Sequence, residues 1–101
     1  MTYTELLSLF ESKGANIDET AFYFKDDPDE QEHFIGYLPQ YDFPYWVGLC
    51  DIKNGCDYAT AKELFEAKIF DGKSIKERWD DIVLFQIGGI FIDDYEDFIS
   101  K

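Results

Sequence analysis

The sequence predicts an α+β domain in which helices pack against a small antiparallel sheet of three to five strands. Two observations support this prediction. A Ser or Thr is followed three residues later by Glu at Thr2, Thr60 and Ser74, which is the capping-box pattern of helix starts. Short runs of aromatic and β-branched residues lie between the first two of these starts, separated by turn-forming stretches. The predicted order is therefore α-β-β-β-α-α-β-α, in one domain that spans residues 1–101.

The first helix is predicted to run from about Thr2 to Lys13. Its apolar face consists of four residues at the spacing i, i+3, i+4, i+7, namely Tyr3, Leu6, Leu7 and Phe10. Gly14 then provides the left-handed conformation that commonly ends a helix. This helix should pack on the sheet with its apolar face.

The next three elements are predicted strands. Residues 21–25 and 33–38 form a hairpin, and its tip, residues 26–32, is polar apart from Pro28. The third strand, residues 45–52, is entered through a connection that contains two prolines. Proline lacks a backbone donor, so this connection is expected outside the interior of the sheet.

The second half of the chain begins with a turn at Asn54-Gly55, the pair that most readily takes positive φ at both central positions. Two helices are then predicted from the capping boxes at Thr60 and Ser74. A short last helix is predicted from Asp93, where Asp takes the place of Ser in the cap pattern.

Residues 82–92 form the most apolar run of the chain and are predicted to contain a central strand. Alternate side chains of a strand point to opposite faces, so a strand that is apolar at successive positions should be covered on both faces. Leu84, Phe85 and Ile87 are therefore expected in the core.

The Gly88-Gly89 pair interrupts this run and predicts a turn. A two-residue type I′ turn requires positive φ at both positions, and it would fold residues 90–92 back against residues 85–87 as a hairpin. The alternative is a strand that ends before the glycines and a flexible joint that leads to the last helix.

Charge is the strongest compositional feature, because the 101 residues include 22 acidic and 9 basic ones, for a net charge of −13. Binding to DNA, RNA or anionic lipid needs a basic surface, so none of these partners is expected. A basic protein partner remains, as does a charge that serves only solubility. The sequence leaves the oligomeric state open.

The first residues lack the positive and apolar regions of a signal peptide, and no run of about 18 apolar residues could span a membrane. A cytoplasmic protein is therefore predicted. In that compartment Cys50 and Cys56 are expected to be reduced thiols, and their spacing matches no zinc motif.

Two neighbouring stretches are candidate partner-binding sites. The tip of the hairpin concentrates carboxylates whose field would steer a basic partner: Asp26, Asp27, Asp29, Glu30 and Glu32. The connection that follows is rich in the aromatic residues that dominate many interfaces, and its candidates are Tyr37, Tyr41, Asp42, Phe43, Tyr45 and Trp46. The structural alternatives are a solvated loop that protects a sheet edge and aromatic side chains that cover the core.

No catalytic residue, metal site or cofactor is predicted. His33 is the only histidine, so any Ser-His-Asp or Cys-His arrangement would depend on this one residue. The acidic stretch lacks the alternating ligands and the glycine of a calcium loop, and the chain has no phosphate-binding glycine loop.

These observations favour a non-enzymatic acidic module that binds and inhibits a basic partner protein, as a nucleic-acid mimic or as an immunity protein that masks a nuclease toxin. One alternative is a small hydrolase-like enzyme that uses His33 or a Cys with carboxylates. Another is a housekeeping domain whose charge serves solubility. A deep cleft that holds His33 and a nucleophile would favour the enzyme, and a flat acidic face bordered by Tyr and Trp would favour the binding module.

Overall fold

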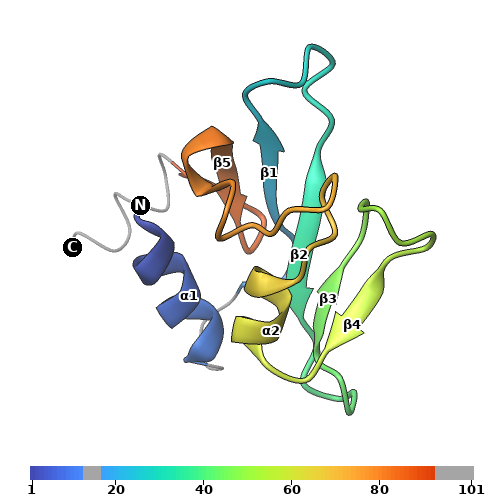
Figure 1. The fold of residues 1–101 in the computed structure, drawn as a ribbon. Coiled ribbons are helices and arrows are strands. Elements are labelled where there is room, and N and C mark those ends of the chain that lie inside the picture. The colour runs from blue at the N-terminus through green and yellow to red at the C-terminus, as the bar shows by residue number, and fades with distance from the viewer. Residues whose placement is uncertain (13–16, 93–101) are drawn as a thin grey trace.

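The computed structural model describes residues 1–12 and 17–92, and within them the chain folds as an α+β protein with one antiparallel sheet (Figure 1). The described sheet has six strands in the order β4-β3-β2-β1-β5-β6. The elements in chain order are α1 (Tyr3–Glu11), β1 (Thr20–Phe24), β2 (His33–Tyr37), β3 (Tyr45–Val47), β4 (Cys56–Tyr58), α2 (Ala61–Glu66), the 3-10 helix η1 (Trp79–Asp81), β5 (Ile82–Ile87) and β6 (Ile90–Phe91). Figure 1 shows α1 and α2 on the same side of the sheet. The predicted class is confirmed, although the sheet has more strands than expected.

Both α-helices begin at their predicted caps. The Thr2 hydroxyl accepts the N–H of Glu5 at 3.1 Å, and the Glu5 carboxylate accepts the N–H of Thr2 at 2.9 Å. The Thr60 hydroxyl accepts the N–H of Glu63 at 3.1 Å. Each bond satisfies an N–H that the first turn of a helix leaves without a helical partner, so local contacts are enough to define these two starts.

The double glycine closes a hairpin, as predicted. Gly88 and Gly89 have φ values of 58° and 81°, and Ile87 pairs with Ile90 across the turn. The predicted end of the first helix at Lys13 and Gly14 lies outside the described residues. So does the helix predicted from residue 93 onward.

The third predicted strand was too long, and a fourth was missed. β3 ends at Val47, and the chain returns after the turn at Asn54-Gly55 as β4, where Cys56 pairs with Val47. Asn54 and Gly55 have φ values of 69° and 77°, so the turn itself is confirmed. A strand of three residues is too short to show a periodicity in the sequence, and its pairing with β3 is what defines it.

The helix predicted at Ser74 is wrong. Its capping contacts exist, because the Ser74 hydroxyl accepts the N–H of Glu77 at 3.0 Å and the Glu77 carboxylate accepts the N–H of Ser74 at 3.1 Å. They enclose only one turn before η1. The N–H of Lys76 lies in this first turn, where a helix offers it no partner, and it donates to the carbonyl of Phe65 in α2 at 3.1 Å. This bond attaches the turn to α2.

The core fills the space between the helices and one face of the sheet. Its buried members include Phe10 and Phe65 from the helices and Phe22, Ile35 and Tyr45 from the strands. The rings of Phe10 and Phe65 lie 5.1 Å apart between centroids. A close-packed aromatic layer of this kind holds the sheet rigid against the helices.

β5 is less buried than predicted. Ile87 lies in the core as expected, but Leu84 and Phe85 are only half-buried. The helices cover one face of the sheet, and the pairing of β1 with β5 skips Phe85 as the extra residue of a bulge. The Phe85 ring instead lies 6.0 Å from the Tyr23 ring between centroids.

Candidate functional site

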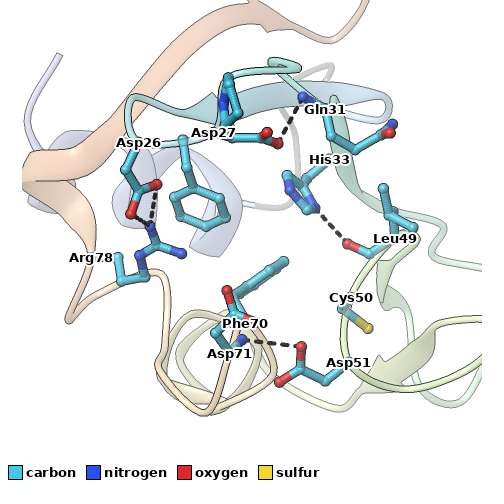
Figure 2. Close-up of a pocket in the computed structure, with 12 residues that line it drawn as sticks. Asp26, Asp27, Gln31, His33, Leu49, Cys50, Asp51, Phe70, Asp71 and Arg78 are labelled. Atoms are coloured by element: carbon cyan, nitrogen blue, oxygen red, sulfur yellow. Dashed lines mark hydrogen bonds and ion pairs between the residues drawn. The ribbon is translucent and has the colours of Figure 1, made fainter.

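A pocket of about 410 Å³ opens at the end of the sheet where β1 ends and β2 begins (Figure 2). Four segments that are distant in the sequence line it: the loop between β1 and β2, the connection after β3, the turn at residues 70–71, and Arg78. Its carboxylates come from three of these segments, and they are Asp26, Asp27, Asp51 and Asp71. We call this cavity the acidic pocket.

Aromatic rings form the floor of the acidic pocket. His33, the first residue of β2, pairs with Phe22 on β1 and stacks on it with 5.4 Å between ring centroids and 21° between planes. Phe24 and Phe70 present their rings to the imidazole at 5.2 Å and 5.3 Å, with interplanar angles of 64° and 89°. Phe24 and Phe70 are buried and His33 is half-buried. The floor is therefore a packed aromatic cluster in which only the His33 ring is substantially exposed to solvent.

Backbone N–H groups hold two of the pocket carboxylates in place. Asp27 accepts the N–H groups of Asp29 and Gln31 at 2.9 Å and 3.0 Å. These bonds favour the ionised form and lower the pKa of Asp27 below its ordinary value. On the other side, Asp51 accepts the N–H groups of residues 71 and 72 at 3.0 Å and 3.1 Å. Each carboxylate keeps further acceptor capacity, because it offers about four lone-pair sites.

One cation already lies against this floor. An Arg78 guanidinium nitrogen lies 2.7 Å and 2.8 Å from the two Asp26 oxygens, and the guanidinium carbon is 3.7 Å from the centre of the Phe24 ring. The Arg78 side chain is 10% exposed, whereas that of Asp26 is 68% exposed. The ion pair is therefore partly screened by solvent, and the stacking on Phe24 contributes much of the stabilisation of Arg78. The pocket keeps an excess of carboxylates over guanidinium.

The pocket also holds His33 and Cys50, the pair on which the enzyme alternative depends. The Nδ1–H of His33 donates to the Leu49 carbonyl at 2.6 Å, and the Cys50 thiol donates to the Ile52 carbonyl at 3.6 Å. Figure 2 shows the Cys50 sulfur pointing away from the imidazole. Neither group activates the other in this arrangement. Among the described residues, no three His, Cys, Asp or Glu side chains are grouped to hold a metal ion.

The predicted partner-binding residues separate into two sets at opposite ends of β2 (Figure 1). Asp26 and Asp27 line the acidic pocket, and Asp29, Glu30 and Glu32 are exposed on the same loop. The aromatic set follows the other end of the strand, where Tyr41, Asp42 and Phe43 are exposed, Tyr37 and Trp46 are half-buried and Tyr45 is buried. A strand of this length separates its ends by roughly 15 Å, so the two sets lie apart although they are neighbours in the sequence.

Tyr45 and Trp46 have structural contacts. The Tyr45 hydroxyl donates to the Phe10 carbonyl in the core at 2.8 Å. The Trp46 indole N–H donates to the Asp18 carboxylate at 2.6 Å, and the ring covers Gly36, where a Cβ would lie within 2.5 Å of the indole nitrogen. For these two residues the structure agrees with the alternative in which aromatic side chains cover the fold.

Sequence reasoning missed several residues of the pocket, namely Phe24, Asp51, Phe70, Asp71 and Arg78, and considered His33 only for the enzyme alternative. The one local signal was the Asp71-Gly72 pair, whose residues have φ values of 56° and 76° and form a turn. Nothing in the sequence connects this turn with Asp51, since the two are joined only by hydrogen bonds across the fold.

This chain matches no protein-family model, no curated protein and no solved structure. Within residues 1–12 and 17–92, no helix is long and apolar enough to cross a membrane.

Proposed function

We propose that this protein is a non-enzymatic interaction module that binds a basic surface of another protein at the acidic pocket and the adjoining loop, residues 26–32. The observation that supports this most directly is the pocket itself, which carboxylates from three separate segments line together with a single guanidinium. Two of them are oriented by pairs of backbone N–H groups. Groups that are already oriented lose little entropy when a cation binds.

The exposed part of the loop supports an electrostatic role before contact. Asp29, Glu30 and Glu32 lie beside the pocket and are exposed to solvent. Like charges gathered around a cavity focus the field and raise the rate at which an oppositely charged partner arrives. A nucleic-acid mimic and an immunity-type inhibitor of a nuclease are two forms of this function, because both occupy a basic surface.

A small hydrolase-like enzyme is the second candidate, and the presence of His33 and Cys50 in one pocket is the observation that favours it. Catalysis would require the Cys50 thiol to leave the Ile52 carbonyl and reach the imidazole. A Cys50→Ser variant separates the two functions, since it removes the nucleophile while preserving every charge. Unchanged partner binding by this variant supports the interaction module, and loss of a measured hydrolytic activity supports the enzyme.

The proposed function is tested by capture from a lysate of the source cells at low and high salt. The bait is compared with a triple variant, Asp29→Asn, Glu30→Gln and Glu32→Gln. A matched control removes three charges elsewhere, with Asp42→Asn, Asp57→Asn and Glu63→Gln. We expect a basic protein that the parent and the control retain at low salt and that the triple variant releases.

Kinetics with the purified partner then give a quantitative result. Neutralising the loop should slow association by roughly threefold to tenfold and flatten its dependence on salt, because exposed charges act mainly on encounter. The control variant should bind like the parent. Binding that ignores salt and is unaffected by the triple variant would contradict the proposal and leave the charge as a solubility device.

A further inference from the structure

We infer that the acidic pocket receives the guanidinium of an arginine side chain from the partner, in preference to a lysine ammonium. This inference rests on the proposed function and identifies the group that the pocket selects. It follows from the shape of the cavity, the chemistry of its walls and the contact that the pocket makes with its own arginine.

The cavity combines an aromatic floor with carboxylates on separate walls. His33 and Phe70 lie on one side, and Asp27 and Asp51 approach from the loops that flank them (Figure 2). A guanidinium is planar and weakly hydrated, stacks on rings and has five N–H donors in a fixed fork. An ammonium is compact and strongly hydrated, so it gains less from an aromatic floor and reaches fewer oriented acceptors.

Arg78 shows that this floor accepts a guanidinium. Its charged group lies 3.7 Å above the Phe24 ring while contacting both oxygens of Asp26 at 2.7 Å and 2.8 Å. On the other side of the cavity, the half-buried His33 ring supplies the aromatic surface, since Phe70 is buried, and Asp51 and Asp71 supply the carboxylates. That second half has carboxylates but no cation among the residues that line it.

Leu49 completes the site for a long side chain. It lies on the rim of the cavity, and its side chain is 48% exposed although its own carbonyl is held by His33. An arginine has an aliphatic stem that packs along apolar surface while its charged end reaches the carboxylates. An arginine that enters past Leu49 would thus pack its aliphatic stem on the Leu49 side chain and bring its guanidinium to the pocket carboxylates.

The test uses three short peptides, acetyl-Gly-Arg-Gly-amide and its lysine and citrulline counterparts, titrated into the full chain at low salt. His33 is the only histidine, so its ring resonances in NMR report on the pocket without overlap. We expect the arginine peptide to shift the His33 ring and the Leu49 amide saturably, and to bind at least about threefold more tightly than the lysine peptide. Citrulline has nearly the same shape without the charge and should bind most weakly.

A matched pair of variants locates the interaction. Asp71→Asn removes a pocket carboxylate at an exposed position with φ of 56°, a left-handed conformation that Asn readily adopts. Asp57→Asn removes the same charge from an exposed position on β4, whose partner in the sheet is Trp46. We expect Asp71→Asn to weaken binding of the arginine peptide several-fold and Asp57→Asn to leave it unchanged.

The inference is overturned if arginine and lysine peptides bind equally, if neither shifts the His33 ring, or if the two variants behave alike. A basic partner whose capture depends on the loop carboxylates would still support the proposed function in those cases. Conversely, a pocket that selects arginine in a protein that retains no basic partner would count against the proposed function alone.

Discussion

The two ends of β2 carry loops that are built in different ways. At the acidic end, residues 26–32 form backbone turns and are held by side chains as well, since Asp27 accepts two backbone N–H groups and Asp26 pairs with Arg78. The pair of Asp26 with Arg78 joins the loop to a residue 52 positions away along the chain. The loop therefore becomes one wall of a cavity.

At the aromatic end, residues 38–44 close through their own backbone. The N–H of Leu38 donates to the carbonyl of Pro44 at 2.8 Å, and the N–H of Tyr41 donates to the Leu38 carbonyl at 3.2 Å. Tyr41 and Phe43 remain 61% and 59% exposed. Polar contacts between distant segments thus shape a cavity at the acidic end, whereas the aromatic end presents exposed rings on a loop that its own backbone closes.

The largest difference between the two ends should appear in stability. Phe70 is 3% exposed beneath the acidic pocket, so Phe70→Ala should lower the free energy of unfolding by about 3–5 kcal/mol through lost packing and a new cavity. Phe43→Ala removes an exposed ring and should change it by no more than about 0.5 kcal/mol. Chemical denaturation monitored by circular dichroism measures both. Similar values for the two variants would contradict the burial of Phe70 beneath the acidic pocket.

A smaller effect is expected from the cation inside the pocket. Arg78→Lys keeps the charge but loses the planar stacking on Phe24, and should lower the free energy of unfolding by about 1 kcal/mol. Lys76→Met is the control, because its ion pair with Glu66 spans 3.8 Å between exposed side chains and should contribute less than about 0.5 kcal/mol. Urea unfolding of both variants would refute the stacking argument if the control were the more destabilised.

The smallest effect is a local response to acid. The folded state lowers the pKa of Asp27, so the stabilisation from its two bonds is present above the ordinary Asp pKa of about 4 and is lost as the pH falls through the lower folded value. Below pH 4 the amide signals of Asp29 and Gln31 in NMR should therefore shift with protonation. The Leu38 amide donates to a carbonyl at the other end and should not follow the same curve. A common titration of all three amides would contradict the expected contrast.

Features that depend on a few neighbouring residues could be predicted from the sequence. The caps at Thr2 and Thr60, the turns at residues 54–55 and 88–89, and the acidic hairpin tip were all found in this way. Each depends on hydrogen bonds or φ values within about four residues, so the sequence contains the whole signal.

Two predictions that needed the surroundings of a segment were wrong. The capping residues at Ser74 and Glu77 form their bonds, yet the segment is a turn that is bonded to α2 through Lys76 and not an α-helix. Phe85 is apolar and was expected in the core, but it is the extra residue of a bulge and lies half-buried. Local preference is weaker than tertiary contact in both cases.

The sequence by itself determined the sign and size of the charge, the helix starts and the tight turns, because these follow from residue types and short-range geometry. The tertiary structure alone decided the site. Asp26, Asp51 and Asp71 meet around one cavity only because strand pairing and the turns that follow it bring their segments together. The aromatic candidates are neighbours of the acidic loop in the sequence, but they lie at the opposite end of β2. The reason is that an extended strand separates its two ends about as far as a chain of that length can.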